Sequence, residues 1–302
     1  MDGEAKMADA MREELASRAD QLRKRLKKAH RGSAQGVHKA RTELRRIRVE
    51  LGTMGHTAFD PRVTTKLEDR LRDVERALAK TRDTDVLLSD VRAHRDLRKV
   101  CKRLEQRRRR SAKRARKALD RKTRRALDTR LRRAAKPKHV AIGKSKNPAY
   151  AAPMLVRHFT HREVWRRYDT LRAYDACLPA DVATLHKLRS ACRELRYTLE
   201  AFQPALPGLE PIARALHALQ DEMGELHDHQ VAIDLLGRWR RKKKIASTEA
   251  LERYLARRAE ARDELRSRSE PRWLGVLGES FRLELARALE PHAEITSPRI
   301  AA

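Results

Sequence analysis

One pattern of positively charged residues occurs twice in this 302-residue chain, and it limits the possible folds more than any other feature. The pattern reads H-K-x-R-x-x-x-R-x-x-R; it begins first at His38 and again at His186, 148 residues further along. Its steps of three, four and three residues follow one face of an α-helix. The sequence therefore predicts two related helices, each with a row of positive charge along one side.

The position of this row on each helix is informative. With about 100° of rotation per residue, the histidine and the three arginines of each copy share an arc of roughly 80°. The apolar residues of the same segments fall beside that arc, whereas a merely solvated charged face lies opposite the apolar face. Cations that only extend their aliphatic stems along a core edge are the alternative interpretation, which repetition in the same phase disfavours. We call the two rows the first stripe and the second stripe; they contain His38, Arg41, Arg45 and Arg48, and His186, Arg189, Arg193 and Arg196.

A second pair of segments supports a duplication of the chain. Arg82-Asp83 aligns with His227-Asp228 at a spacing of 145 residues, close to the 148 of the stripes. Two matches at nearly one spacing indicate an internal repeat. The segment 136–148 is rich in Gly, Ser, Asn and Pro and is interpreted as a linker, so the halves are predicted at residues 1–140 and 141–302. The paired aspartates are expected to hold a stripe arginine in place or to cap a helix.

Helical periodicity dominates the chain. Apolar residues recur at steps of three and four, and no segment alternates apolar and polar residues for long enough to predict a strand. A long and very basic helical run is expected over about 99–134. Each half contains four or five predicted helices, which is enough for one helical bundle. The sequence therefore predicts an all-α fold.

The charge balance indicates an anionic partner. Lys plus Arg number 72 against 42 for Asp plus Glu, which gives a formal net charge of +30. Such a field attracts nucleic acid, anionic membranes and inorganic polyanions, while an aromatic content of 4% argues against a base-stacking platform. No apolar stretch is long enough to span a membrane, and the first residues do not form a secretion signal. The expected location is the cytoplasm, with no role in a membrane.

Four segments of the chain together resemble the CHAD family, the conserved-histidine α-helical domain. They run over 37–48, 79–88, 185–197 and 219–231, in the order found in the family. The resemblance implies two pseudo-symmetric four-helix bundles around a basic central groove. It also implies binding of inorganic polyphosphate and association with polyphosphate granules in bacteria. The E-x-E-x-K strand of the triphosphatase domain to which some members are fused is absent, so a stand-alone member is expected.

The expected polyphosphate site combines both stripes with neighbouring residues of the four segments. Arginine suits phosphate because its planar guanidinium can donate two hydrogen bonds to one group, and lysine adds a point charge. Glu194 occupies the position of Arg46 in the second copy, and both lie outside the shared arc. The candidate binding residues are His38, Lys39, Arg41, Arg45, Arg46, Arg48, Arg82, His186, Lys187, Arg189, Arg193, Arg196, Tyr197 and His227.

Two other functions remain open. The basic segment 102–133 predicts RNA or DNA binding, at least weakly, if it acts as a flexible electrostatic arm and not as a solvated helix face. His227-Asp228-His229 suggests a metal-dependent phosphohydrolase, but Asp228 aligns with Asp83 in a copy that lacks both histidines. The sequence also lacks a Gly-rich phosphate loop and a nucleophile elbow. We therefore expect no catalytic residue, no metal and no cofactor.

Overall fold

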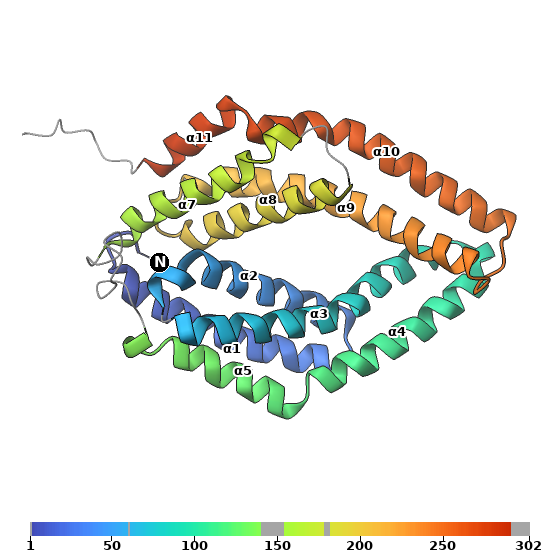
Figure 1. Cartoon of the computed structure of the whole chain (residues 1–302), viewed down its shortest axis with the longest axis horizontal. Helices are drawn as coiled ribbons and strands as arrows, with labels where there is room; N and C mark the ends of the chain where they lie inside the picture. Colours follow the sequence, from blue (N-terminus) through green and yellow to red (C-terminus); the bar gives the residue numbers. More distant parts are fainter. Residues whose placement is uncertain (1, 60, 140–153, 178–181, 291–302) are drawn as a thin grey trace, which may run out of the picture. The chain divides into compact units, whose positions relative to one another are not determined.

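The computed structural model describes residues 2–59, 61–139, 154–177 and 182–290. Within these ranges the chain is helical, and the β-structure is limited to isolated bridge residues, among them the pair Lys6 and Leu155. The prediction of an all-α fold is confirmed (Figure 1). The longer helices are α1 (Met7–His30), α2 (Ala34–Ala58), α3 (Pro61–Val91), α4 (Arg98–Ala118), α5 (Arg121–Ala134), α7 (Val156–Arg172), α8 (Val182–Phe202), α9 (Leu209–Arg241), α10 (Glu249–Leu277) and α11 (Glu279–Leu289).

The chain forms two compact units. The large unit comprises Met7–Met154 and Asp221–Ser269, and the small unit comprises Met1–Lys6, Leu155–Gln220 and Glu270–Ala302. Helices α9 and α10 therefore contribute to both units. The predicted halves, 1–140 and 141–302, refer to a duplication of the sequence. The division into compact units does not test that duplication, so the halves stay a prediction.

The large unit is built on the helices α1 to α5. Helix α1 packs against α2 and α5, and α3 packs against α2 and α4. Leucines at helical spacing, such as Leu15, Leu22 and Leu26 of α1, are almost fully buried. Each such side chain contributes about 1.5–3 kcal/mol through removal of its apolar surface from water. The helical periodicity of the sequence thus becomes the core of a bundle.

The turn between α1 and α2 depends on two glycines. Gly32 adopts a φ of +85°, a left-handed conformation that glycine accepts without steric cost. The hydroxyl of Ser33 caps α2 by accepting a hydrogen bond from the amide of Gly36 at 3.1 Å. A Cβ at Gly36 would lie 2.8 Å from the carbonyl carbon of Lys28. Gly36 is therefore required because the backbone of α1 passes directly against the first turn of α2.

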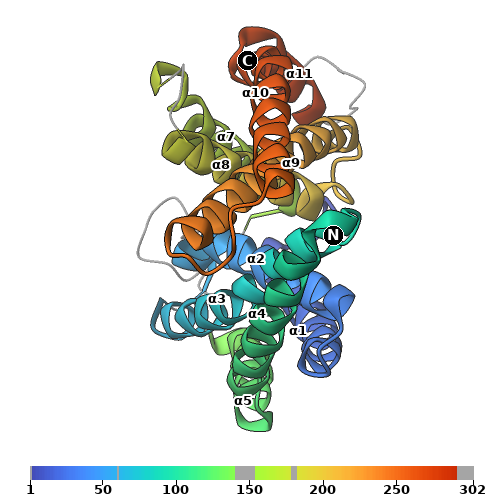
Figure 2. The ribbon, with the colours of Figure 1, turned by 90° about the vertical axis from the view of Figure 1, so that its right-hand side faces the viewer.

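The basic run predicted over 99–134 consists of two helices and not one. Helix α4 ends at Ala118, and the carboxylate of Asp120 caps α5 by accepting a hydrogen bond from the Thr123 amide at 2.6 Å. Figure 2 shows α4 leading through this break into α5. Leu104 of α4 and Leu131 of α5 are fully buried. The interpretation of this segment as a flexible arm is wrong, because its apolar residues pack into the bundle.

The second part of the large unit comes from α9 and α10. Leu236 and Trp239 of α9 and Tyr254 of α10 pack against Leu88 and Leu104, which come from α3 and α4. The Tyr254 hydroxyl donates a hydrogen bond to Asp90, which also pairs with Arg258 of α10. Local periodicity does not reveal this association, because the partners are more than a hundred residues apart in the chain.

The small unit packs α7 against α8. Phe159 and Tyr168 of α7 and Phe202 of α8 are among its largest fully buried side chains. Phe281 of α11 lies against the Tyr168 ring, with 5.7 Å between the ring centroids.

Among the helices described, none has the length and apolar character needed to cross a membrane.

A group of charged residues is buried between α1 and α2. The Arg18 guanidinium contacts Glu50 at 2.9 Å, Glu14 at 2.7 Å and Glu43 at 3.4 Å, and Arg25 also pairs with Glu43. Glu43 and Glu50 are both buried. Burial raises the pKa of Glu50 to about 8; Arg18 opposes the increase, and the carboxylates of Glu14 and Glu43 add to it. Glu50 is therefore protonated over part of the range in which an ordinary glutamate is charged.

This raised pKa predicts a pH dependence of folding stability. Between pH 4.5, the ordinary pKa of a glutamate, and about 8, folded Glu50 holds a proton that the unfolded chain has released. The contribution of this bound proton to the free energy of unfolding is complete below pH 4.5 and is lost as the pH rises through about 8. The free energy of unfolding then changes by at most about 1.4 kcal/mol per pH unit. Glu50→Gln should remove this component. When the free energy of unfolding is measured by chemical denaturation at several values between pH 5 and pH 8, it should therefore change less with pH in the variant than in the unchanged chain. Identical curves for the two proteins would contradict the shift.

Candidate anion-binding site

The first stripe lies along α2, beside the buried face of that helix. His38 and Lys39 are exposed, and Arg41, Arg45 and Arg48 are partly buried. The apolar residues between them, among them Ala40, Leu44 and Ile47, are fully buried. The geometric prediction from the helical wheel is confirmed, because the cations border the core and do not lie opposite to it.

Two carboxylates of α3 hold the arginines of this stripe. Arg45 Nε donates to Glu75 Oε1 at 2.7 Å, and Arg48 Nη1 donates to the other oxygen, Oε2, at 2.5 Å. Burial alone would raise the pKa of Glu75, but the charges and hydrogen bonds of Arg45 and Arg48 lower it. Arg41 Nη1 contacts Asp83 Oδ1 at 3.4 Å. The expectation that Asp83 holds a stripe arginine is met, whereas Glu75 was not identified from the sequence.

Further cations surround the first stripe. The pKa of His38 is lowered, first by burial and then by the positive charges of Arg82, Arg41, Arg45 and Lys39. Burial and the neighbouring Arg45 likewise lower the pKa of Arg41. Arginine remains charged despite such a shift because its ordinary pKa is above 12. The site therefore holds several positive charges near one histidine that is neutral at physiological pH.

Helices α4 and α9 add two arginines that are not among the candidate binding residues predicted from the sequence. Arg107 of α4 donates from Nε to the Thr84 hydroxyl at 3.3 Å. Its pKa is lowered by burial and by Arg238 of α9, and raised by Asp83. Asp83 is thus a common neighbour of Arg41 and Arg107. We call this group the cationic cluster; it contains His38, Arg41, Arg45, Arg82, Arg107 and Arg238, and all six belong to the large unit.

Residue type does not separate Arg107 from its neighbours in the run Arg107–Arg110, and helical phase is the one local signal that does. Arg107 and Arg108 are partly buried, while Arg109 and Arg110 are exposed. Arg108 donates to Asp85 at 2.9 Å and to the Gly32 carbonyl at 2.7 Å, so it ties α4 to α3 and to the α1–α2 turn. The helical phase of the buried Leu104 and Ala115 could have indicated which arginines face inward.

The second stripe lies on α8 in the small unit. His186 and Lys187 are exposed, and Arg189 and Arg193 are partly buried. Arg193 donates to the Ser190 hydroxyl at 3.1 Å. The last members are more enclosed: Arg196 and Tyr197 are both buried. The Arg196 guanidinium lies 4.6 Å from the centroid of the Tyr197 ring and pairs with Glu200 at 3.0 Å.

The departure at Glu194 has a structural reason. Glu194 Oε2 accepts a hydrogen bond at 2.5 Å from Arg167, a buried arginine of α7. Burial lowers the pKa of Arg167, and the charge of Glu194 opposes the decrease. A basic residue at position 194 would repel this arginine. Arg46, which occupies the position of Glu194 in the first copy, is partly buried on α2.

The histidine motif of α9 is divided between surface and core. His227 is partly buried, Asp228 is exposed, and His229 is buried. Arg258 Nη1 lies 3.2 Å from His229 Nδ1, and burial followed by the charge of Arg258 lowers the pKa of His229. Among the residues that the structure describes, no group of three or more His, Cys, Asp or Glu side chains is arranged to hold a metal ion.

The predicted residues are thus distributed over both compact units. The first stripe, Arg82 and His227 lie in the large unit, and the second stripe and Tyr197 lie in the small unit. Within the large unit, the fold brings Arg82 to the first stripe. A central groove shared by both stripes stays a prediction.

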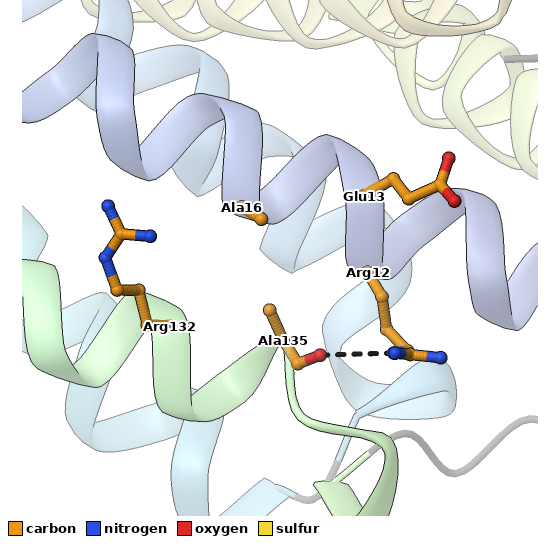
Figure 3. A pocket seen from close by; sticks show the side chains of 5 residues that line it. All are labelled: Arg12, Glu13, Ala16, Arg132 and Ala135. Carbon is orange, nitrogen blue, oxygen red and sulfur yellow. Dashed lines mark hydrogen bonds between the residues drawn. The ribbon is translucent and has the colours of Figure 1, made fainter.

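A pocket of about 320 Å³ lies between α1 and α5 and contains none of the predicted residues (Figure 3). Its arginines already have internal partners. Arg12 Nε donates to the Ala135 carbonyl at 3.3 Å, and Arg132 pairs with Asp20 at 2.6 Å and with Asp128 at 3.2 Å. We therefore place the candidate site at the cationic cluster and not in this pocket.

Comparison with known proteins gives a family. The model of the CHAD domain matches residues 13–237, a range that contains both stripes. The fold is similar to the crystal structure of the CHAD domain from the plant Ricinus communis, with a TM-score of 0.68 at 20% identity, covering 89% of this chain and 93% of that one. It is also similar to PptA from Streptomyces chartreusis, with a TM-score of 0.67 at 18% identity, covering 90% and 99%. No curated protein matches. Because the family model covers well over half of the sequence, this chain belongs to the CHAD family.

Proposed function

We propose that this protein binds inorganic polyphosphate through the cationic cluster, and that the second stripe provides further contacts to the same polymer. The proposal includes the two-bundle duplication around a basic groove that family membership implies. It also includes a location in the cytoplasm at polyphosphate granules. No metal or cofactor has a role in this function.

The observation that carries the proposal is the convergence of positive charge from four helices. Arg41 of α2 and Arg82 of α3 lower the pKa of His38, and Arg238 of α9 lowers the pKa of Arg107 on α4. Bringing like charges together is unfavourable in the empty protein, and a polyanion relieves the repulsion. Polyphosphate carries roughly one negative charge per internal phosphate, so it can neutralise many cations at once.

The arrangement favours a chain of phosphates over a small anion. The first stripe extends over about 15 Å of helix, which exceeds the reach of one phosphate group. Each guanidinium can donate two parallel hydrogen bonds to phosphate oxygens. The His38 ring can donate one more hydrogen bond, whether it is neutral or protonated. The cluster contains no Phe, Tyr or Trp ring on which a base could stack, so it offers less to a single-stranded nucleic acid.

A titration with polyphosphate at two salt concentrations tests the proposal. Affinity should decrease steeply with salt, because each neutralised phosphate releases a counterion. An excess of duplex DNA should leave labelled polyphosphate bound, whereas an excess of unlabelled polyphosphate should displace it. Displacement by DNA at the same charge concentration would instead support the nucleic-acid alternative for this site.

We also propose that the protein performs no chemical step on the polymer. Incubation with polyphosphate, followed by measurement of chain length on a gel and of free phosphate, should show no change. Release of phosphate that depends on His227 or Asp228 would instead support the phosphohydrolase alternative.

A further inference from the structure

The outward face of α4 carries a second array of cations that the proposed polyphosphate site does not use. The inward side of the helix is marked by the buried residues Val100, Leu104, Ser111 and Ala115. On a helical wheel, an arc of roughly 120° on the opposite side contains exposed lysines and arginines and one neutral residue, Gln106, but no carboxylate. The cations of this outer face are Arg98, Lys99, Lys102, Arg109, Arg110, Lys113, Arg116 and Lys117.

These outer cations differ from the inner arginines of the same helix. Arg107 and Arg108 hold α4 against its neighbours through Thr84, Asp85 and the Gly32 carbonyl. None of the eight outer side chains forms a hydrogen bond or ion pair with another of the described residues. Helix α4 is therefore already positioned without them, and its outer charges have no role in packing that the structure shows.

The face also lacks the mixed charge of an ordinary solvated helix. Exposed arginines elsewhere have acidic neighbours one turn away, as in Asp20–Arg23 of α1 and Glu249–Arg253 of α10. On the outer face of α4 the positions one turn apart carry like charges, for example Arg109 and Lys113. Glu105, one turn before Arg109, lies beside this face and pairs with Arg92. Like charges at this spacing destabilise a helix. The outer face of α4 thus reduces helix stability unless a polyanion neutralises it.

We propose that this face binds double-stranded nucleic acid through its phosphate backbone, without reading the base sequence. The 21 residues of α4 extend over about 31 Å, so the eight cations are spaced at about 4 Å along the axis. The charges of one strand of a duplex are spaced at about 3.4 Å along its axis. A stiff duplex can meet several points of a straight row at once, whereas a flexible polyphosphate chain loses conformational freedom when it is held straight. Helices α4 and α5 contain no aromatic residue, so contact is limited to phosphates.

The test compares two variants that each lose four positive charges. The first replaces Arg109, Lys113, Arg116 and Lys117 of the outer face by glutamine. The second replaces the exposed run Arg241, Lys242, Lys243 and Lys244, at the end of α9 and in the turn that follows it, by glutamine. Binding of a 30-base-pair DNA duplex is measured by fluorescence anisotropy at several salt concentrations, with polyphosphate binding measured in parallel. Circular dichroism confirms that both variants keep their helices.

The outer-face variant should bind the duplex at least about tenfold more weakly and show a smaller salt slope, by about 3 to 4, since each lost phosphate contact reduces it by about 0.9. Its polyphosphate affinity should stay within about twofold, and the α9–α10 variant should bind the duplex almost as well as the unchanged chain. Equal losses of duplex binding in both variants would assign the effect to net charge and overturn the proposal. A loss of polyphosphate binding alone would overturn it too, by making the face part of the polyphosphate site.

Discussion

A chain that carries both Arg41→Ala and Arg189→Ala is expected to bind polyphosphate at least about a hundredfold more weakly than the unchanged chain. Each substitution removes one arginine from a stripe, and a hydrogen bond to a charged group contributes about 1.5–3 kcal/mol. Two such losses together correspond to a factor of about a hundred or more. The loss at Arg41 is reinforced by Asp83, whose carboxylate pairs with Arg41 at 3.4 Å and would then oppose the phosphates. Isothermal titration with polyphosphate measures the effect.

Asp83→Asn is the matched control with the opposite sign. It removes the carboxylate that neighbours both Arg41 and Arg107, so polyphosphate should bind several-fold more tightly. Arg41→Lys keeps the charge but loses the planar fork, and its affinity should lie between those of the unchanged chain and Arg41→Ala. If the folded double variant bound polyphosphate as well as the unchanged chain, the stripes would not be the binding site.

Arg18→Met is expected to destabilise the fold by about 3 kcal/mol at pH 8. Arg18 is the partly buried partner of the buried Glu50, and removal of one member of a buried ion pair costs about 3–5 kcal/mol because the other charge loses its compensation. Glu43 retains Arg25, so the cost falls mainly on Glu50. At pH 5 the destabilisation should be smaller, because folded Glu50 already carries a proton at that pH and has no charge for Arg18 to compensate. Urea denaturation at both pH values measures the difference.

The control for this prediction is Arg23→Met on the same helix. Arg23 and Asp20 form an ion pair at 3.3 Å in which both side chains are well exposed. Exposed pairs contribute about 0–1 kcal/mol, so the free energy of unfolding of this variant should be close to that of the unchanged chain. Equal destabilisation by both substitutions would show that Arg18 acts through helix propensity or general charge and not through the buried carboxylates.

The features that the sequence predicted well depend on positions a few residues apart. Arg41, Arg45 and Arg48 fall beside the core because the helical repeat alone determines their angle from Leu44 and Ile47. The end of a helix is less predictable: α2 extends to Ala58, past Gly52 and Gly55, although glycines commonly mark a helix end. Glycine lowers helix stability by only about 1 kcal/mol, so it need not end a helix.

The partners of the stripe were not predictable in this way. Glu75 joins Arg45 to Arg48 from another helix, and Arg107 and Arg238 reach Asp83 from α4 and α9. Dozens of carboxylates and arginines in the chain could have filled these positions. Only the packing of α3, α4 and α9 in the large unit selects among them, because a contact between distant segments has no periodicity to reveal it.

The sequence by itself determined the all-α fold, the two stripes and the family, because these depend on helical spacing and on motifs read along the chain. The tertiary structure decided which cations converge. It turned Arg107 and Arg108 inward and left Arg109 and Arg110 outside, and it split the predicted basic arm into two packed helices. The physical reason is burial: apolar residues such as Leu104 fix the rotation of each helix against its neighbours, and the charged residues take the positions that this rotation leaves to them.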